Sequence, residues 1–501
     1  MLGDASQDRA PRYANGKPAV WKGAASALRP ERYVHRMAAL RDIRLWLLLF
    51  FAIRLIGIAN PPLETAHHWR QTTVLMVARN YHERGIDILH PRVDMAGEKS
   101  GITGMEFPLL SAVIAAQSRL FGFAHWHARL IVLIMGTLGA WAFHQLLKRY
   151  VNSEVAFWAT IALSASLWFM YGRKVMPDVF SLSLVLLGLL AASRCLDGHR
   201  AWLNGALAVG LIMLGALSKL PSGCLLAVLP LMLLSHAAGG ARRWWLALAV
   251  AIGLVPVAWW YFIQVPYLNA LGDYVHFFMG MPMSNGARML LDHLGRTLDN
   301  FYFDALRFSG AAAAIVGLII AVRRRMRAVL WSALACSLAF AVVMLKAGDA
   351  FWKHAYYVLP FVPVMAMLAG VAIAAIPKQG LRIVAMAIIV GEGLANQWQD
   401  FRLSPSLAPE LGLEAAMDRL GSRDELIVVN SAAIPTPLYI AHRNGWTATS
   451  KDMMRPSFLD SLAALGCKHA IVLRVGGDGE IPLARPIESE HEAFRIYGLK
   501  R

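Results

Sequence analysis

The stretch DVFSLSLVLLGLLAASR, residues 178–194, decides the class of fold. Between Asp178 and Arg194 it contains no charged residue, and most of its side chains are apolar. A helix that crosses a bilayer needs about 20 mostly apolar residues, so this stretch predicts a membrane-spanning helix. Ten further segments have the same character: 42–58, 128–147, 154–171, 202–218, 222–237, 244–264, 309–322, 328–345, 356–376 and 382–396. We therefore predict an all-α polytopic membrane protein with about eleven transmembrane helices.

The composition of the whole chain agrees with this class. Hydrophobic residues make up 57% of the 501 residues and charged residues only 16%, whereas soluble chains average about 45–50% and about 25%. These values exclude a soluble enzyme, a disordered protein and a nucleic-acid-binding protein. The formal net charge of +17 comes largely from short basic clusters between the apolar segments. Nucleic acid is therefore not an expected partner.

The basic clusters predict the orientation in the membrane. With eleven spans, the clusters at Lys148–Arg149, Arg242–Arg243 and Arg323–Arg325 all fall on one side, which the positive-inside rule makes cytoplasmic. Residues 1–40 then form a cytoplasmic basic arm, and they lack the apolar core of a cleavable signal. Residues 41–396 form the transmembrane domain, whose loops 59–127 and 265–308 lie on the outer side. We expect a bacterial inner (plasma) membrane protein.

The tail over residues 397–501 has a different composition. ELIVVN at 425–430 and AIVL at 470–473 predict buried strands, and residues 413–420 and 457–465 predict amphipathic helices. The tail is therefore expected to be a small α/β domain on the outer, periplasmic or extracytoplasmic side.

Polar side chains crowd the start of the first outer loop, NPPLETAHHWRQTTVLMVARNY at residues 60–81. If residues 64–81 are helical, their spacing places four polar side chains on one face. These candidates and their neighbours are Glu64, His67, His68, Trp69, Arg70 and Gln71. Glu64 is a candidate general base, and the alternative is a carboxylate that favours the helix dipole. The adjacent histidines point in different directions on a helix, so no shared metal site is expected.

The same loop continues with EKSGITGMEFPLLSAVIAAQSRLFG, residues 98–122. Its apolar part is too short and interrupted for a span, and a helix lying in the membrane interface fits it better. Glu106 stands just before that part and either faces substrate or marks the water edge. The four cysteines are far apart and predict neither a disulfide framework nor a zinc site.

Charged residues also occur in the short outer loops. YGRKVMPDVFSL at 171–182 carries Arg173 and Asp178, and ionisable residues at membrane depth are functional candidates by default; the alternative for Asp178 is a helix start behind Pro177. Lys219, in GALSKLPSG at 215–223, opposes the positive-inside pattern and has no other charge nearby in sequence. We favour a role for Lys219 in binding an anionic phosphate over the alternative, in which its side chain only snorkels to the water.

The loop KAGDAFWKHAYYVLP, residues 346–360, gathers further cations and aromatic residues, among them Lys353, His354, Tyr356 and Tyr357. An interfacial aromatic belt explains the tyrosines without a function. It does not explain the cations.

Taken in order, these motifs resemble the GT-C superfamily of integral-membrane glycosyltransferases, within it the aminoarabinose lipid A transferase and protein O-mannosyltransferase group. The resemblance covers about residues 40–376 and rests on several blocks in the sequence. They are Glu64, His67–Gln71, Ala78–Asn80, Glu106–Pro108, Arg173 to Asp178, Ser218–Lys219 and His354 to Tyr357. Many relatives carry Asp or an Asp-Glu pair where this chain has Glu64 alone.

The resemblance implies an inverting glycosyltransferase that uses a polyprenyl-phosphate sugar as donor. Glu64 or Asp178 would then be the catalytic carboxylate, with Glu64 favoured because it opens the most polar segment. Lys219, Arg173, Lys353 and His354, with Tyr356 and Tyr357, would hold the donor phosphate. The acceptor would be a glycan, lipid or protein hydroxyl on the outer face, with membrane lipid around it. No cofactor is implied, and a divalent metal is not expected to be essential.

Two other classes of function compete with this interpretation. A lipid-linked sugar transporter or flippase would need polar groups along the depth of the bundle. The predicted spans contain few such groups, and Arg54 and Glu392 are the clearest examples. A receptor or assembly protein would leave the polar first loop unexplained.

Overall fold

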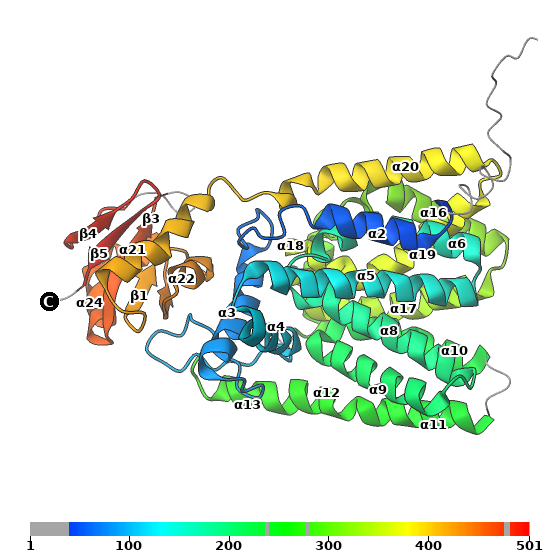
Figure 1. Ribbon diagram of the computed structural model, residues 1–501, viewed down its shortest axis with the longest axis horizontal. Coiled ribbons are helices and arrows are strands. Elements are labelled where there is room, and N and C mark those ends of the chain that lie inside the picture. Colours follow the sequence, from blue (N-terminus) through cyan, green and yellow to red (C-terminus); the bar gives the residue numbers. More distant parts are fainter. Residues whose placement is uncertain (1–39, 236–239, 276–279, 475–480, 500–501) are drawn as a thin grey trace, which may run out of the picture. The chain divides into compact units, whose positions relative to one another are not determined.

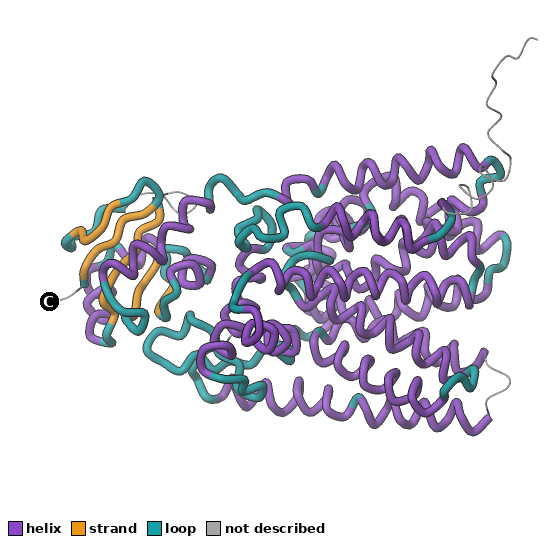
Figure 2. Tube along the Cα trace, viewed as in Figure 1, coloured by secondary structure: helices purple, strands orange, loops and turns teal. Residues whose placement is uncertain are grey.

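The computed structural model of the protein describes residues 40–235, 240–275, 280–474 and 481–499. The predicted basic arm therefore lies outside the described residues, apart from its last position. The described residues from Ile43 onward form one compact unit. Figure 1 shows its long helices running roughly parallel in a bundle, and Figure 2 shows that the strands belong to the C-terminal part of the chain.

Six helical segments of the described residues are long and apolar enough to cross a membrane, as in a multi-pass membrane protein. They are α5 (His125–Tyr150), α8 (Pro177–Leu196), α9 (Ala201–Ser218), the run Gly240–Ala270 from α11 (Gly240–Gly253) through α12 (Val255–Trp259) to α13 (Val265–Ala270), α17 (Arg327–Ala347), and the run Ala355–Ala375 that contains α19 (Val362–Ala375). A seventh forms if Leu294–Ala305 and Arg307–Arg323, bent by 95°, count as one. The predicted count of eleven is not confirmed.

The four remaining predicted spans coincide with helices that are short, broken or more polar. They are α2 (Ile43–Arg54), α6 (Ser153–Ala165) with α7 (Leu167–Tyr171), η1 (Leu220–Val228) with α10 (Leu229–Ser235), and α20 (Gln379–Asn396). The break between α6 and α7 has a local cause, because the Ser166 side chain accepts a hydrogen bond from the Trp168 N–H and so caps α7. Arg382 and Glu392 lower the hydropathy of α20.

A carboxylate from α20 stabilises the bend before α16 (Arg307–Arg323). Arg307 adopts the left-handed conformation there, with φ 60°. Glu392 accepts hydrogen bonds from the backbone N–H groups of Phe308 (3.1 Å) and Ser309 (2.9 Å), and from the Ser309 hydroxyl. The first N–H groups of a helix have no partner within it, and their dipole favours a negative charge. Glu392 thus supplies the cap of a helix 84 residues earlier in the chain.

The C-terminal part contains one five-stranded mixed sheet of order β2-β1-β3-β5-β4. Its strands are β1 (Leu426–Val429), β2 (Gly445–Thr447), β3 (Cys467–Leu473), β4 (Ile487–Glu490) and β5 (Phe494–Gly498). The first three pair in parallel, and β5 runs antiparallel to β3 and β4. The two predicted strands and two predicted helices are present as β1, β3, α21 (Leu413–Leu420) and α24 (Pro456–Ala464).

One apolar core connects this sheet with residues 59–127, the predicted first outer loop. Val74 of α3 (His68–Arg84) and Ile114 of α4 (Leu109–Phe121) belong to the same buried cluster as Leu438 of α22 (Thr436–Ala441) and Ile496 of β5. Arg79 adds polar contacts, since it donates to the Tyr439 carbonyl at 2.8 Å and pairs with Asp94 at 2.7 Å. The sheet therefore supports α3, the helix that carries the polar residues of the first loop.

Candidate active site

Helix α3 begins at His68, four residues later than the predicted helix over 64–81. His67 takes the left-handed conformation, with φ 59°, and ends the preceding turn. The predicted group on one helix face is therefore not formed. His67 Nδ1 hydrogen-bonds to the Tyr171 hydroxyl at 2.8 Å, whereas His68 Nδ1 bonds to the Thr436 hydroxyl at 2.8 Å.

Glu64 is buried and has partners on both carboxylate oxygens. It pairs with Arg129 through Oε1, and Oε2 accepts a hydrogen bond from Gln71 at 2.7 Å. Burial alone would raise its pKa, but the charges of Arg129 and Lys174 outweigh burial and lower the pKa of Glu64 below its ordinary value. A carboxylate with a lowered pKa is a weak base. Glu64 is placed to hold α3, α5 and the turn before α3 together.

Four charged side chains from four segments meet in a buried cluster. Arg70 pairs with Glu106, and the Lys219 ammonium lies 3.0 Å from Glu106 Oε1 and 3.5 Å from Asp178 Oδ1. All four are at most 8% exposed. The second oxygen of Asp178, Oδ2, is buried without a hydrogen-bond partner among the described residues. An unpartnered buried carboxylate oxygen is costly, so it suggests a group that a substrate satisfies.

The local structure explains how these residues meet. Asp178 lies in the first turn of α8 behind Pro177, where proline and an acidic side chain both suit a helix start. Lys219 stands between α9 and η1 with extended backbone, so its side chain leaves the helix axis. Glu106 lies in the loop just before α4, and Arg70 belongs to the first turn of α3. The predicted helix-start role of Asp178 is therefore compatible with a place in the cluster.

A cavity of about 250 Å³ opens beside this cluster. Glu106, Lys219 and Tyr357 line it together with Lys346 at the end of α17. The rest of its wall is mostly apolar, with Leu220, Pro221, Val342, Val343 and Ala347. An apolar pocket with a few convergent charged groups has the make-up of a ligand site.

Aromatic and imidazole rings cover another side of the cluster. Tyr356 lies under the Lys219 ammonium, 5.3 Å from ring centre to nitrogen, and His354 stacks on Tyr356 at 5.4 Å. The His67 ring lies 4.9 Å from Tyr356, and Trp69 lies 5.7 Å from His354. Burial, then the charge of Lys174, lowers the pKa of His67 to about 3. Burial, then the charge of Lys353, also lowers the pKa of His354, so both rings are neutral at pH 7.

Two predicted phosphate ligands lie apart from the cluster. Arg173 donates to the Gly57 carbonyl at 2.9 Å and stacks over Phe401 at 4.3 Å. Lys353 is half exposed and pairs with Asp349 at 2.6 Å. Neighbouring Lys174 is buried and pairs with Asp400 at 2.9 Å. Among the described residues, no group of three or more His, Cys, Asp or Glu is placed to hold a metal.

Several residues of the site were not assigned a role from the sequence. Arg129 lies inside a predicted span. Tyr171, and Tyr261, which lines the cavity, lie in apolar stretches of the sequence. Lys346 stood among the cations of its loop, and its position beside Lys219 depends on the packing of α17 against η1. Arg129 and Lys346 could have been found from the sequence, because each is a charged residue at the edge of a predicted span.

The neutral state of His67 predicts a pH-dependent stability. Its folded pKa of about 3 is below its ordinary value of 6.5, so between these values the unfolded chain binds a proton that the folded chain does not. The free energy of unfolding therefore falls as the pH drops through 6.5. We expect the loss in melting temperature between pH 7 and pH 5 to be smaller in His67→Asn than in the unaltered protein. The exposed His199→Asn is the control, and equal losses in all three would contradict the prediction.

Comparison with known proteins adds two results. Residues 106–262 match the family model of dolichyl-phosphate-mannose-protein mannosyltransferases. That range begins at Glu106 and includes Asp178 and Lys219. No curated protein sequence matches the chain.

Solved structures share the fold. ArnT from Cupriavidus metallidurans bound to undecaprenyl phosphate is similar with a TM-score of 0.59 at 14% identity, over 91% of this chain and 98% of that one. Its apo state gives 0.60 at 15% identity over the same shares. The archaeal oligosaccharyltransferase AglB from Archaeoglobus fulgidus, in complex with an inhibitory peptide and a dolichol-phosphate, gives 0.51 at 12% identity, over 86% and 69%. The resemblance to GT-C glycosyltransferases is confirmed by the family model and the fold.

Proposed function

We propose that the protein is an inverting glycosyltransferase that moves a sugar from a polyprenyl-phosphate donor to an acceptor hydroxyl. The observation that carries this proposal is the Arg70–Glu106–Lys219–Asp178 cluster beside an apolar cavity. Two proteins with this fold are described with undecaprenyl phosphate and dolichol-phosphate bound, which supports a lipid phosphate as the donor group.

Lys219 and Lys346 are the proposed ligands of the donor phosphate. Arg70, Lys219, Glu106 and Asp178 together carry no net charge, so a phosphate needs a further cation, and Lys346 on the same cavity wall supplies it. The apolar wall, with Pro221 and Val342, suits the first prenyl units of the lipid. Held in this way the phosphate is a good leaving group, because the cations stabilise its charge as the bond to the sugar breaks.

Asp178 is the proposed general base. The acceptor oxygen attacks the anomeric carbon, the bond from that carbon to the phosphate oxygen breaks, and the acceptor proton moves to Asp178 Oδ2. Attack opposite to the leaving phosphate inverts the anomeric configuration. Glu64 was the favoured base in the sequence interpretation. Its partners on both oxygens and its lowered pKa now support a positioning role for it instead.

The rings of His67, Trp69, His354 and Tyr356 suit the sugar and the acceptor. Flat apolar faces with polar edges pack against sugar rings and still offer hydrogen bonds. The acceptor is a hydroxyl of a glycan, lipid or protein at the outer face of the inner membrane. In this arrangement the N-terminus is cytoplasmic and the C-terminal sheet lies outside, with no metal essential.

Lys346→Ala tests this proposal. We expect it to weaken binding of a polyprenyl-phosphate sugar by about tenfold, the value of a charge-assisted contact to phosphate. The matched control is Lys353→Ala, which removes a lysine of the same outer region that pairs with Asp349 away from the cavity. The measurements are donor affinity and release of polyprenyl phosphate by purified protein. Equal losses of donor affinity in the two variants would contradict the proposal. So would a failure of the unaltered protein to release polyprenyl phosphate with any acceptor fraction from the cell envelope.

A further inference from the structure

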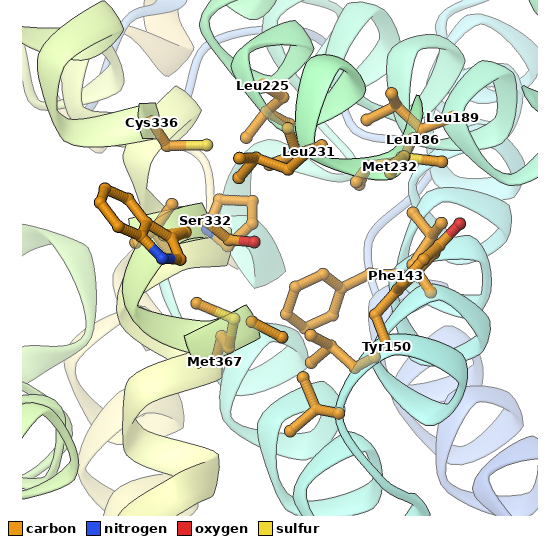
Figure 3. A pocket seen from close by; sticks show the side chains of 18 of the residues that line it. Phe143, Tyr150, Leu186, Leu189, Leu225, Leu231, Met232, Ser332, Cys336 and Met367 are labelled. Carbon is orange, nitrogen blue, oxygen red and sulfur yellow. The ribbon is translucent and has the colours of Figure 1, made fainter. Parts of the chain in front are cut away.

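A second cavity lies at the end of the bundle away from the candidate active site. Its volume is about 350 Å³. Phe143 and Leu189 line it from the C-terminal halves of α5 and α8, the same helices that hold Arg129 and Asp178 near their N-terminal ends. Figure 3 shows Phe143, Leu231 and Met367 around the hollow. The sugar-transfer chemistry proposed above uses none of these residues.

The wall of this cavity is almost entirely apolar, with side chains from α5, α8, η1, α10, α17 and α19. A cavity whose wall is mostly apolar offers water few hydrogen-bond partners and favours an apolar ligand. The cavity is also open rather than enclosed, and its helices are those of a membrane-spanning bundle. The ligand that surrounds such a bundle is the hydrocarbon chain of a lipid.

The rim of the cavity is basic. Arg327, the first residue of α17, lines it and is exposed, and no ion-pair partner of Arg327 lies within the described part of the chain. Arg323, Arg324 and Arg325 come just before it, and none of the described residues that line the cavity is acidic. Tyr150 and Ser332 add polar groups beside the apolar wall. Basic clusters at a membrane surface favour anionic lipid headgroups.

We infer that the cavity binds one anionic phospholipid, whose acyl chain fills the apolar part and whose phosphate contacts Arg327. The lipid then fills the space between the helices that line the cavity. Under the predicted topology it belongs to the cytoplasmic leaflet. The polyprenyl-phosphate donor is a poorer occupant, because its proposed phosphate ligands, Lys219 and Lys346, lie at the other end of the bundle.

The test compares lipid retention by four versions of the purified, delipidated full chain. Phosphatidylglycerol and phosphatidylcholine with identical acyl chains are titrated in detergent, and bound lipid is counted by native mass spectrometry alongside the melting temperature. The unaltered protein is expected to retain one phosphatidylglycerol, with about tenfold preference over phosphatidylcholine. Arg327→Gln is expected to lose that preference, whereas Arg324→Gln, which removes the same charge outside the cavity lining, keeps it. Ser332→Phe, which fills the cavity, is expected to lose retention of both lipids.

Three outcomes would overturn the inference. Equal losses of the preference for phosphatidylglycerol in Arg327→Gln and Arg324→Gln would show that the preference comes from the overall surface charge and not from a contact with Arg327. Unchanged phosphatidylglycerol retention in Ser332→Phe, or in Leu231→Phe if the former does not fold, would show that the cavity is not the site. Loss of polyprenyl-phosphate binding rather than phosphatidylglycerol binding in the filled variant would assign the cavity to the donor chain. None of these results depends on sugar transfer, so the proposed function can fail or stand independently.

Discussion

Asp178→Asn is expected to lower the rate of sugar transfer by about 10²–10⁴-fold, the usual loss when a general base is removed. Asparagine keeps the size of the side chain and can still accept a hydrogen bond, but it cannot take the acceptor proton. Donor affinity should change much less than the rate, because the proposed phosphate ligands remain. The measurements are single-turnover transfer and donor binding with purified protein.

Glu64→Gln distinguishes the role of Glu64 from that of Asp178. Glutamine leaves the charge of Arg129 buried and unpaired, and loss of one partner from a buried ion pair is strongly destabilising. We therefore expect a lower melting temperature and a smaller loss of transfer in the folded fraction than in Asp178→Asn. Full transfer by Asp178→Asn together with a dead but stable Glu64→Gln protein would return the role of base to Glu64.

Lys219→Ala is expected to weaken donor binding by about tenfold or more, since a charge-assisted contact to a phosphate is lost. The same change also leaves Glu106 and Asp178 without the ammonium that lies between them. A simple loss of activity would therefore not distinguish phosphate binding from folding.

The double variant Lys219→Met/Glu106→Gln makes that distinction. It removes one positive and one negative charge and keeps similar volumes, so the net charge of the cluster returns to zero. Arg70 loses its direct partner Glu106, and Asp178 remains as the negative charge that balances it, so the melting temperature should recover in part. Donor binding should stay weak, because the proposed phosphate ligand is still missing. Recovery of donor affinity along with stability would mean that Lys219 only balances the buried carboxylates.

The class of fold and part of the candidate active site could be predicted from the sequence alone. Long apolar runs predict membrane helices, and Lys219 drew attention because a lone cation opposed the charge pattern of the loops. These signals are local in sequence. The helix of the first loop was predicted to begin four residues too early, because the left-handed conformation of His67 leaves no mark in the pattern of polar residues.

Other features depend on contacts between distant segments. Glu106 was predicted either to face substrate or to mark the water edge, and it is buried between Arg70 and Lys219. Arg173 was also predicted from its charge at membrane depth, but it stacks over Phe401, more than two hundred residues away. Pairings of this kind are set by helix packing, which periodicity and charge do not reveal.

The cap of α16 by Glu392 has a consequence for how the protein is made. Phe308 leaves the ribosome 84 residues before Glu392, and at about 5–20 residues per second that interval is roughly 4–17 seconds. Until then the first turn of α16 lacks the acceptor that it has in the finished fold, and unsatisfied backbone groups cost several kcal/mol in lipid. Formation of α20 during biosynthesis therefore completes the first turn of a helix that was synthesised earlier.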